Sequence, residues 1–79
     1  MTLKKAVSNR IFELCKEKNI TYSALGIRSD VPHVTIHDLL VCRNEAPNLM
    51  TIKKLCDGFD ITLDEFFNTA KFKDLKGQL

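Results

Sequence analysis

The sequence feature that most restricts the fold of this chain is the pattern of residues 22–41, YSALGIRSDVPHVTIHDLLV. Two short segments with helical character stand about three residues apart here, so their helices must cross steeply. Such a crossing requires a small residue in the first helix, a residue that tolerates a bend in the turn and an apolar residue inside the second helix. These requirements are met by Gly26, Asp30 and Ile36. We therefore predict a helix-turn-helix whose second helix, Pro32 to Leu40, presents its N-terminal part outward.

The remaining chain also has helical periodicity, and it has no strand pattern. Apolar residues recur at helical spacing over residues 3–15 and 49–59. A capping box in TLDEFF pairs Thr62 with Glu65 at the start of a further helix. Three other helices begin after residues with suitable capping side chains, which are Thr2, Thr21 and Asn48. The pattern predicts an all-α fold of five helices.

Length and composition allow one domain with one small core. A chain of 79 residues with 44% apolar content buries a marginal amount of surface, and self-association often helps such domains. We predict the domain over residues 1–68 and a C-terminal extension over residues 69–79. The central core residues that we predict are Leu25, Ile36, Leu39, Ile52, Leu55 and Phe66.

The cysteines and the absence of long apolar runs bear on the cellular compartment. No apolar run reaches the roughly 18 residues of a membrane span, and the N-terminus lacks the apolar region of a signal peptide. We therefore expect a cytoplasmic protein without a membrane anchor. Cys15, Cys42 and Cys56 are widely spaced and odd in number, and each lies in an apolar pattern. This arrangement predicts reduced, buried thiols rather than disulfides or a zinc cluster.

Three segments of the chain resemble one family in order and spacing. The segments NRIFELCKEKNIT, LGIRSDVPHVTI and TIKKLCDGFDITLDEFF are similar to the small Cro/C1-type (XRE-family) helix-turn-helix regulators, particularly the single-domain kind common in Firmicutes. The resemblance runs from about Val7 to Phe67. It implies a lambda-repressor-like domain of five helices that binds double-stranded DNA. It also implies repression of transcription by a homodimer on a palindromic operator.

The resemblance assigns DNA contacts to the outward part of the second motif helix. Its base-facing positions are His33, Val34, His37 and Asp38. The positions that it places near the DNA backbone are Thr21, Tyr22, Arg28, Thr35, Arg43 and Asn44, and Tyr22 could equally pack against the next helix. Val34 suits a thymine methyl group, histidine suits purine edges and Asp38 suits cytosine N4. None of these makes the strong bidentate pairs of Arg or Asn with bases, so we expect modest sequence specificity.

Four positions depart from the family pattern. Asp30 and Cys42 stand where Gly is usual, and the second departure could shift Arg43 and the residue after it relative to a DNA backbone. Many relatives join the first helix to the third by an Arg–Glu pair, whereas the aligned positions here are Cys15 and Leu40. We predict that an apolar contact between these two side chains replaces the ion pair.

Other functions find less support in the sequence. Residues 30–48 carry one basic residue against three acidic ones, a net charge of −2, which favours a protein-interaction module as the alternative. His33 and His37 have the spacing of two zinc ligands, but no third ligand is evident, so we predict no metal site. No nucleophile and base arrangement, phosphate loop, cofactor motif or small-molecule site is visible, so we expect no enzyme.

The extension after the fifth predicted helix has an apolar stripe. Phe72, Leu75 and Leu79 recur at spacings of three and four on a segment too short to form a stable helix alone. It could cover the first helix of its own domain or bind a second copy of the chain. We favour the second copy, with Phe67, Phe72 and Leu75 as dimer contacts.

Overall fold

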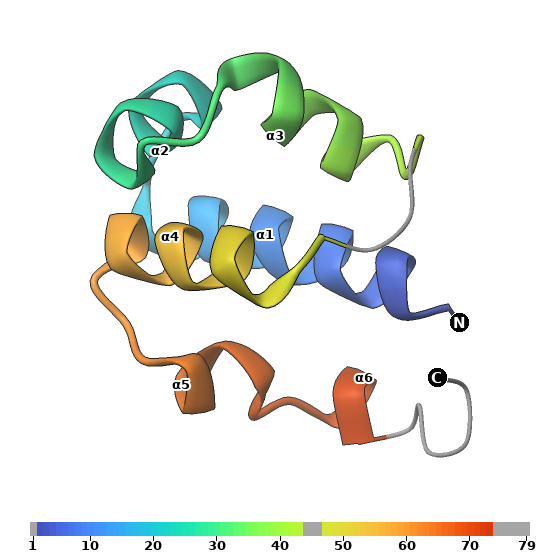
Figure 1. The fold of residues 1–79 in the computed structure, drawn as a ribbon. Coiled ribbons are helices and arrows are strands. Elements are labelled where there is room, and N and C mark those ends of the chain that lie inside the picture. Colours follow the sequence, from blue (N-terminus) through green and yellow to red (C-terminus); the bar gives the residue numbers. More distant parts are fainter. Residues whose placement is uncertain (1, 44–46, 74–79) are drawn as a thin grey trace.

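The computed structural model describes residues 2–43 and 47–73, and within these ranges the regular structure is entirely helical (Figure 1). The first five helices are those that the sequence predicts, and a sixth short helix lies in the extension. Their bounds are α1 Leu3–Lys18, α2 Tyr22–Ser29, α3 His33–Leu40, α4 Leu49–Phe59, α5 Leu63–Phe67 and α6 Ala70–Lys73. The predicted all-α fold is therefore confirmed.

Capping residues explain where these helices begin. The predicted caps Thr2, Thr21 and Asn48 each accept a hydrogen bond from a backbone amide in the first turn of the helix that follows. Thr62 and Glu65 form the complete predicted capping box at the start of α5. These side chains satisfy amide groups that have no partner inside their own helix, so each helix starts at a defined residue.

The core lies where the first five helices meet, and it contains five of the six predicted central residues. Leu25, Ile36, Leu55 and Phe66 are completely buried and Ile52 nearly so. Leu39 is an exception, because it is only partly buried at the edge of the core. Leu39 lies three residues after Ile36 and therefore points to the flank of the buried stripe of α3.

Hydrogen bonds from two side chains of α1 fix the positions of α3 and α5. The Ser8 hydroxyl donates to the Leu40 carbonyl at 2.8 Å, at the end of α3. The Arg10 guanidinium donates to the Phe66 carbonyl at 2.8 Å and to the Glu65 carbonyl at 2.7 Å, at the end of α5. Residues two apart on a helix point about 200° apart, so α3 and α5 lie on opposite sides of α1. Figure 1 shows the same separation, with α3 at the top and α5 at the bottom.

The described part of the extension packs on its own domain. Phe72 in α6 is partly buried, and its ring lies 4.9 Å from the ring of Phe67 and 5.9 Å from that of Phe66, between centroids. Helix α6 also contacts α1. Phe67 and Phe72 therefore use part of their surface inside the monomer, while Leu75 lies outside the described residues.

The cysteines differ in their surroundings. Cys15 and Cys56 are buried as predicted, whereas Cys42 is only partly buried, so the prediction of a buried thiol is wrong there. Cys42 follows α3 and adopts the left-handed conformation, with φ of 55°, so it takes the backbone path that glycine usually provides. Cys15 belongs to the core, and Leu40 packs against that core from α3. Direct contact between these two side chains stays a prediction.

Candidate nucleic-acid interface

The turn between α2 and α3 depends on the two residues that the sequence pattern identified. Asp30 stands at the position where glycine is usual, and it ends α2 in the left-handed conformation, with φ of 58°. The Val31 amide then donates to the Gly26 carbonyl at 3.2 Å. A Cβ atom on Gly26 would lie 3.1 Å from the Val31 carbonyl oxygen, which is closer than ordinary contact. The small residue in α2 therefore lets the chain turn directly into α3.

Helix α3 has one buried side and one outward side. Ile36 is completely buried, whereas His33 and His37 are exposed and Val34 is 64% exposed. Thr35 is half-buried beside them. The helical pattern explains this division, because residues 33, 34 and 37 lie on one face of the helix and residue 36 does not. Three of the four predicted base-facing residues thus share an accessible surface.

The fourth predicted base-facing residue, Asp38, lies at the edge of this surface. Only 21% of its side chain is exposed, and its Oδ1 atom lies 3.6 Å from Nη1 of Arg43 and 3.8 Å from Nδ1 of His37. The carboxylate is thus held beside a cation of the following loop. This geometry suits a residue that positions Arg43, and it leaves little of Asp38 available to a base.

The predicted backbone contacts lie in several different environments. Arg28 is exposed at the end of α2, and the side chain of Arg43 is 64% exposed after α3. The Thr21 hydroxyl accepts a hydrogen bond from the Ala24 amide at 3.1 Å, while the residue itself remains exposed. The last predicted contact, Asn44, lies outside the described residues. Both arginines can therefore reach a phosphate group.

Tyr22 is partly buried and packs against the core. Burial, and to a lesser extent the neighbouring Cys15 thiol, raise the pKa of Tyr22 above its usual value of 10.0. Its hydroxyl therefore remains a neutral donor at physiological pH. Packing thus accounts for much of this side chain, and a phosphate contact stays a prediction.

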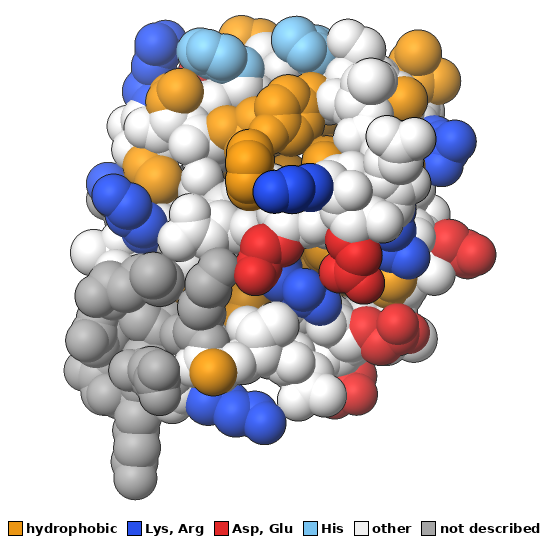
Figure 2. Space-filling view, turned by 180° about the vertical axis from the view of Figure 1, so that it is seen from behind, with side chains coloured by type: hydrophobic (Ala, Val, Ile, Leu, Met, Phe, Trp, Pro, Cys, Tyr) orange, Lys and Arg blue, Asp and Glu red, His pale blue; other side chains and the backbone are white. Residues whose placement is uncertain are grey.

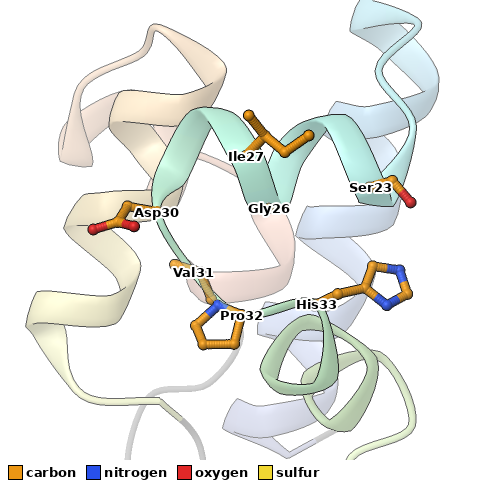
Figure 3. A pocket seen from close by; sticks show the side chains of 7 residues that line it. All are labelled: Ser23, Gly26, Ile27, Asp30, Val31, Pro32 and His33. Carbon is orange, nitrogen blue, oxygen red and sulfur yellow. The ribbon is translucent and has the colours of Figure 1, made fainter.

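A shallow pocket of about 470 Å³ lies where the turn joins the two motif helices (Figure 3). Ser23 at the start of α2 and His33 at the start of α3 both line it, and their side chains point to the same side in this view. Asp30 points to the opposite side. Ile27 also lines the pocket and is 84% exposed. Ser23 therefore joins the accessible surface of α3, although the sequence pattern gave no signal for it.

On one face of the molecule, the histidines of α3 lie apart from most of the acidic side chains. Figure 2 shows the two histidines at the top of that face, hydrophobic side chains below them and a group of acidic side chains in a lower band. Anionic groups near α3 would repel phosphate. The histidine end is therefore the end of this face that suits a polyanion.

Other kinds of site find no support in the described part of the chain. No group of three metal-binding side chains occurs there, so His33 and His37 have no third ligand among those residues. No described helix is long and apolar enough to cross a membrane.

An outward helix held behind a tight turn, with exposed arginines on both sides, defines a helix-turn-helix DNA-binding domain as the class of this protein. The sequence matches the family model of the Cro/C1-type HTH DNA-binding domain over residues 10–71. The chain therefore belongs to this family, which consists of DNA-binding regulators of transcription rather than enzymes. No curated protein and no solved structure was found to match. An origin in Firmicutes stays a prediction.

Proposed function

We propose that this protein binds specific sequences in double-stranded DNA and represses transcription as a homodimer on a palindromic operator. The observation that carries the proposal is the outward face of α3, where His33, Val34 and His37 are exposed while Ile36 anchors the helix in the core. A helix of this length, about 12 Å, fits the major groove, which is about 12 Å wide. The histidines and Val34 would then meet base edges, and Arg28 and Arg43 would meet phosphates.

The size of the domain supports a dimer on two half-sites. The half-sites of such operators lie about 34–36 Å apart, one turn of the DNA helix. The domain measures 34 × 24 × 21 Å, so two copies side by side can present their α3 helices at about this spacing. A two-fold axis parallel to the outward direction of α3 is required, because both helices must face the same duplex.

This requirement bears on the predicted dimer contact through Phe67, Phe72 and Leu75. The α5–α6 side lies opposite the α3 side (Figure 1). A dimer contact there would put the two-fold axis perpendicular to the outward direction of α3, so the two α3 helices would face in opposite directions. Phe67 and Phe72 also cover each other and Phe66 within the monomer. These two observations support a contact on another side of the domain.

Fluorescence anisotropy with labelled duplex DNA tests the proposal. We expect the affinity to fall as salt rises, with a slope of about −2 to −5 in a plot of log affinity against log salt, because few cations meet phosphates. Arg28→Ala and Arg43→Ala should weaken binding to all sequences similarly, and Lys54→Ala, an exposed lysine on α4, is the matched control. His37→Ala should change the sequence preference more than the general affinity.

A protein-interaction module is the alternative that one observation favours. The segment that contains α3 has a net charge of −2, which weakens attraction to DNA. No binding to mixed-sequence DNA at low salt, with the fold intact by circular dichroism, would support this alternative and refute DNA binding.

A further inference from the structure

Val34, on the outward face of α3, and Val41, the residue that directly follows α3, lie on one line of the helix. Val34 is 64% exposed and Val41 is 52% exposed. Seven residues separate them, which is within about 20° of two complete helical turns, so the two side chains point in nearly the same direction. The helical path continues to Val41, because its amide donates to the His37 carbonyl at 3.1 Å. The two valines are thus about 10.5 Å apart along the helix axis.

The neighbours of this line make the two valines prominent. His33 and His37 lie beside it on the outward face, and Asp38 on its other side is held near Arg43. A single exposed valine is ordinary on a protein surface. Val34 and Val41 lie in line on the outward side of α3 and its C-terminal cap, where they form an apolar surface with a defined spacing.

The chemistry of the major groove offers one matching group. Among the base pairs, only those that contain thymine present an apolar group there, the C5-methyl group. A distance of about 10.5 Å corresponds to about three base pairs at about 3.4 Å each, or to two where a helix follows the slant of the groove. The spacing of the valines therefore matches thymines that lie two or three base pairs apart.

We propose that Val34 and Val41 both determine the DNA sequence by contacting the methyl groups of two thymines, two or three base pairs apart, in each half-site. This inference rests on the proposed function. Val34 was predicted to face a base, whereas Val41 is a new specificity residue. The two histidines then provide the polar contacts between and beside the two methyl groups.

Replacement of thymine by deoxyuridine tests this pair of contacts, because it removes only the methyl group. The full chain would first select its preferred sequence from random duplex DNA. Each thymine of that sequence would then be replaced in turn, and affinity measured by anisotropy. We expect two positions, two or three base pairs apart, at which the replacement weakens binding about fourfold.

Valine variants show which valine contacts the methyl group at each sensitive position of the DNA. Val34→Ser should remove the sensitivity to deoxyuridine at one position and Val41→Ser at the other, each leaving the second position sensitive. Phe12→Ser, which changes another exposed apolar side chain, on α1, should leave both positions sensitive.

The outcomes separate this inference from the proposed function. Specific binding with no methyl-sensitive pair, or a pair that Val41→Ser leaves unchanged, would overturn the inference and leave DNA binding intact. Failure to bind or select any DNA would refute the proposed function and the inference together.

Discussion

Ile36 and Val34 are two residues apart on α3, and their environments are opposite. Ile36 has no exposed surface, whereas Val34 is 64% exposed. The difference comes from the helical repeat, which turns their side chains about 200° apart. At the scale of single residues, the same apolar chemistry therefore stabilises the fold at one position and is available for DNA at the other.

Truncation of these two side chains should have very different effects on stability. Ile36→Ala should lower the free energy of unfolding by about 2–5 kcal/mol, because it removes buried methyl groups and leaves a cavity. Val34→Ala should change it by no more than about 0.5 kcal/mol. Urea denaturation measures both values. Equal effects would mean that α3 is rotated from the position described above.

The three cysteines should differ in reactivity and in their effect on stability at high pH. Burial raises the pKa of Cys15 and Cys56 above the usual 9.0. Their thiols therefore stay neutral in the folded protein at pH values where they ionise in the unfolded chain. The contribution of these two neutral, buried thiols to the free energy of unfolding is therefore present below about pH 9. It is lost as the pH rises above that value. We expect Ellman's reagent to modify Cys42 first in the native protein and all three after unfolding.

Rapid modification of Cys15 or Cys56 in the native state would contradict this prediction. Cys42→Ser provides the control, because it removes the partly exposed thiol and should abolish the fast phase.

At the scale of helices, α2 and α4 approach each other closely. Helix α2 packs mainly against α4, and Gly58 faces Ser29 there. A Cβ atom on Gly58 would lie 2.8 Å from Cβ and 3.0 Å from the backbone nitrogen of Ser29. The Ser29 hydroxyl is itself held by the Leu25 carbonyl at 2.6 Å. The first motif helix is thus seated on α4 through a glycine.

Gly58→Ala should destabilise the protein although alanine favours helices. The added methyl group must push α2 from α4, which we expect to cost about 1–3 kcal/mol of unfolding free energy. In an open helix position the same change would stabilise by about 0.5–1 kcal/mol. Thermal denaturation measures the sign, and Lys54→Ala at an exposed position of α4 is the control. A raised melting temperature for Gly58→Ala would contradict the close contact.

At the scale of the whole molecule, α1 separates the α3 side from the α5–α6 side (Figure 1). Ser8 binds the end of α3 and Arg10 binds the end of α5 from opposite faces of one helix. The proposed dimer would have to keep the α3 side free and repeat it by a two-fold axis. The position of α1 therefore limits which surfaces are suitable for dimer formation.

Sedimentation of the full chain and of a chain that ends at Asn68 tests this limit. We expect both chains to form dimers, because the contact that allows two α3 helices to face one duplex should not require residues after 68. Circular dichroism would confirm that loss of Phe72 from the aromatic cluster leaves the fold intact. A dimer that becomes monomeric on truncation, while folded, would instead support the predicted contact through Phe67, Phe72 and Leu75.

Local chemistry made much of this fold predictable from sequence. The four capping side chains and the left-handed Asp30 act on backbone groups within a few residues, so their effects can be read directly from the chain. The helical repeat likewise separates Ile36 from His33, Val34 and His37. Ser23 and Arg10 gave no such signal, because their neighbours in the fold come from distant parts of the sequence or depend on the turn.

The sequence by itself therefore determined the first five helices, the turn, the family and most of the outward face of α3. Only the tertiary structure decided that Leu39 lies at the core edge, that Asp38 is held beside Arg43 and that Phe72 covers its own domain. The physical reason is the range of the interactions. Caps, turns and helical faces depend on neighbours along the chain, whereas burial and pairing depend on which helices pack against each other.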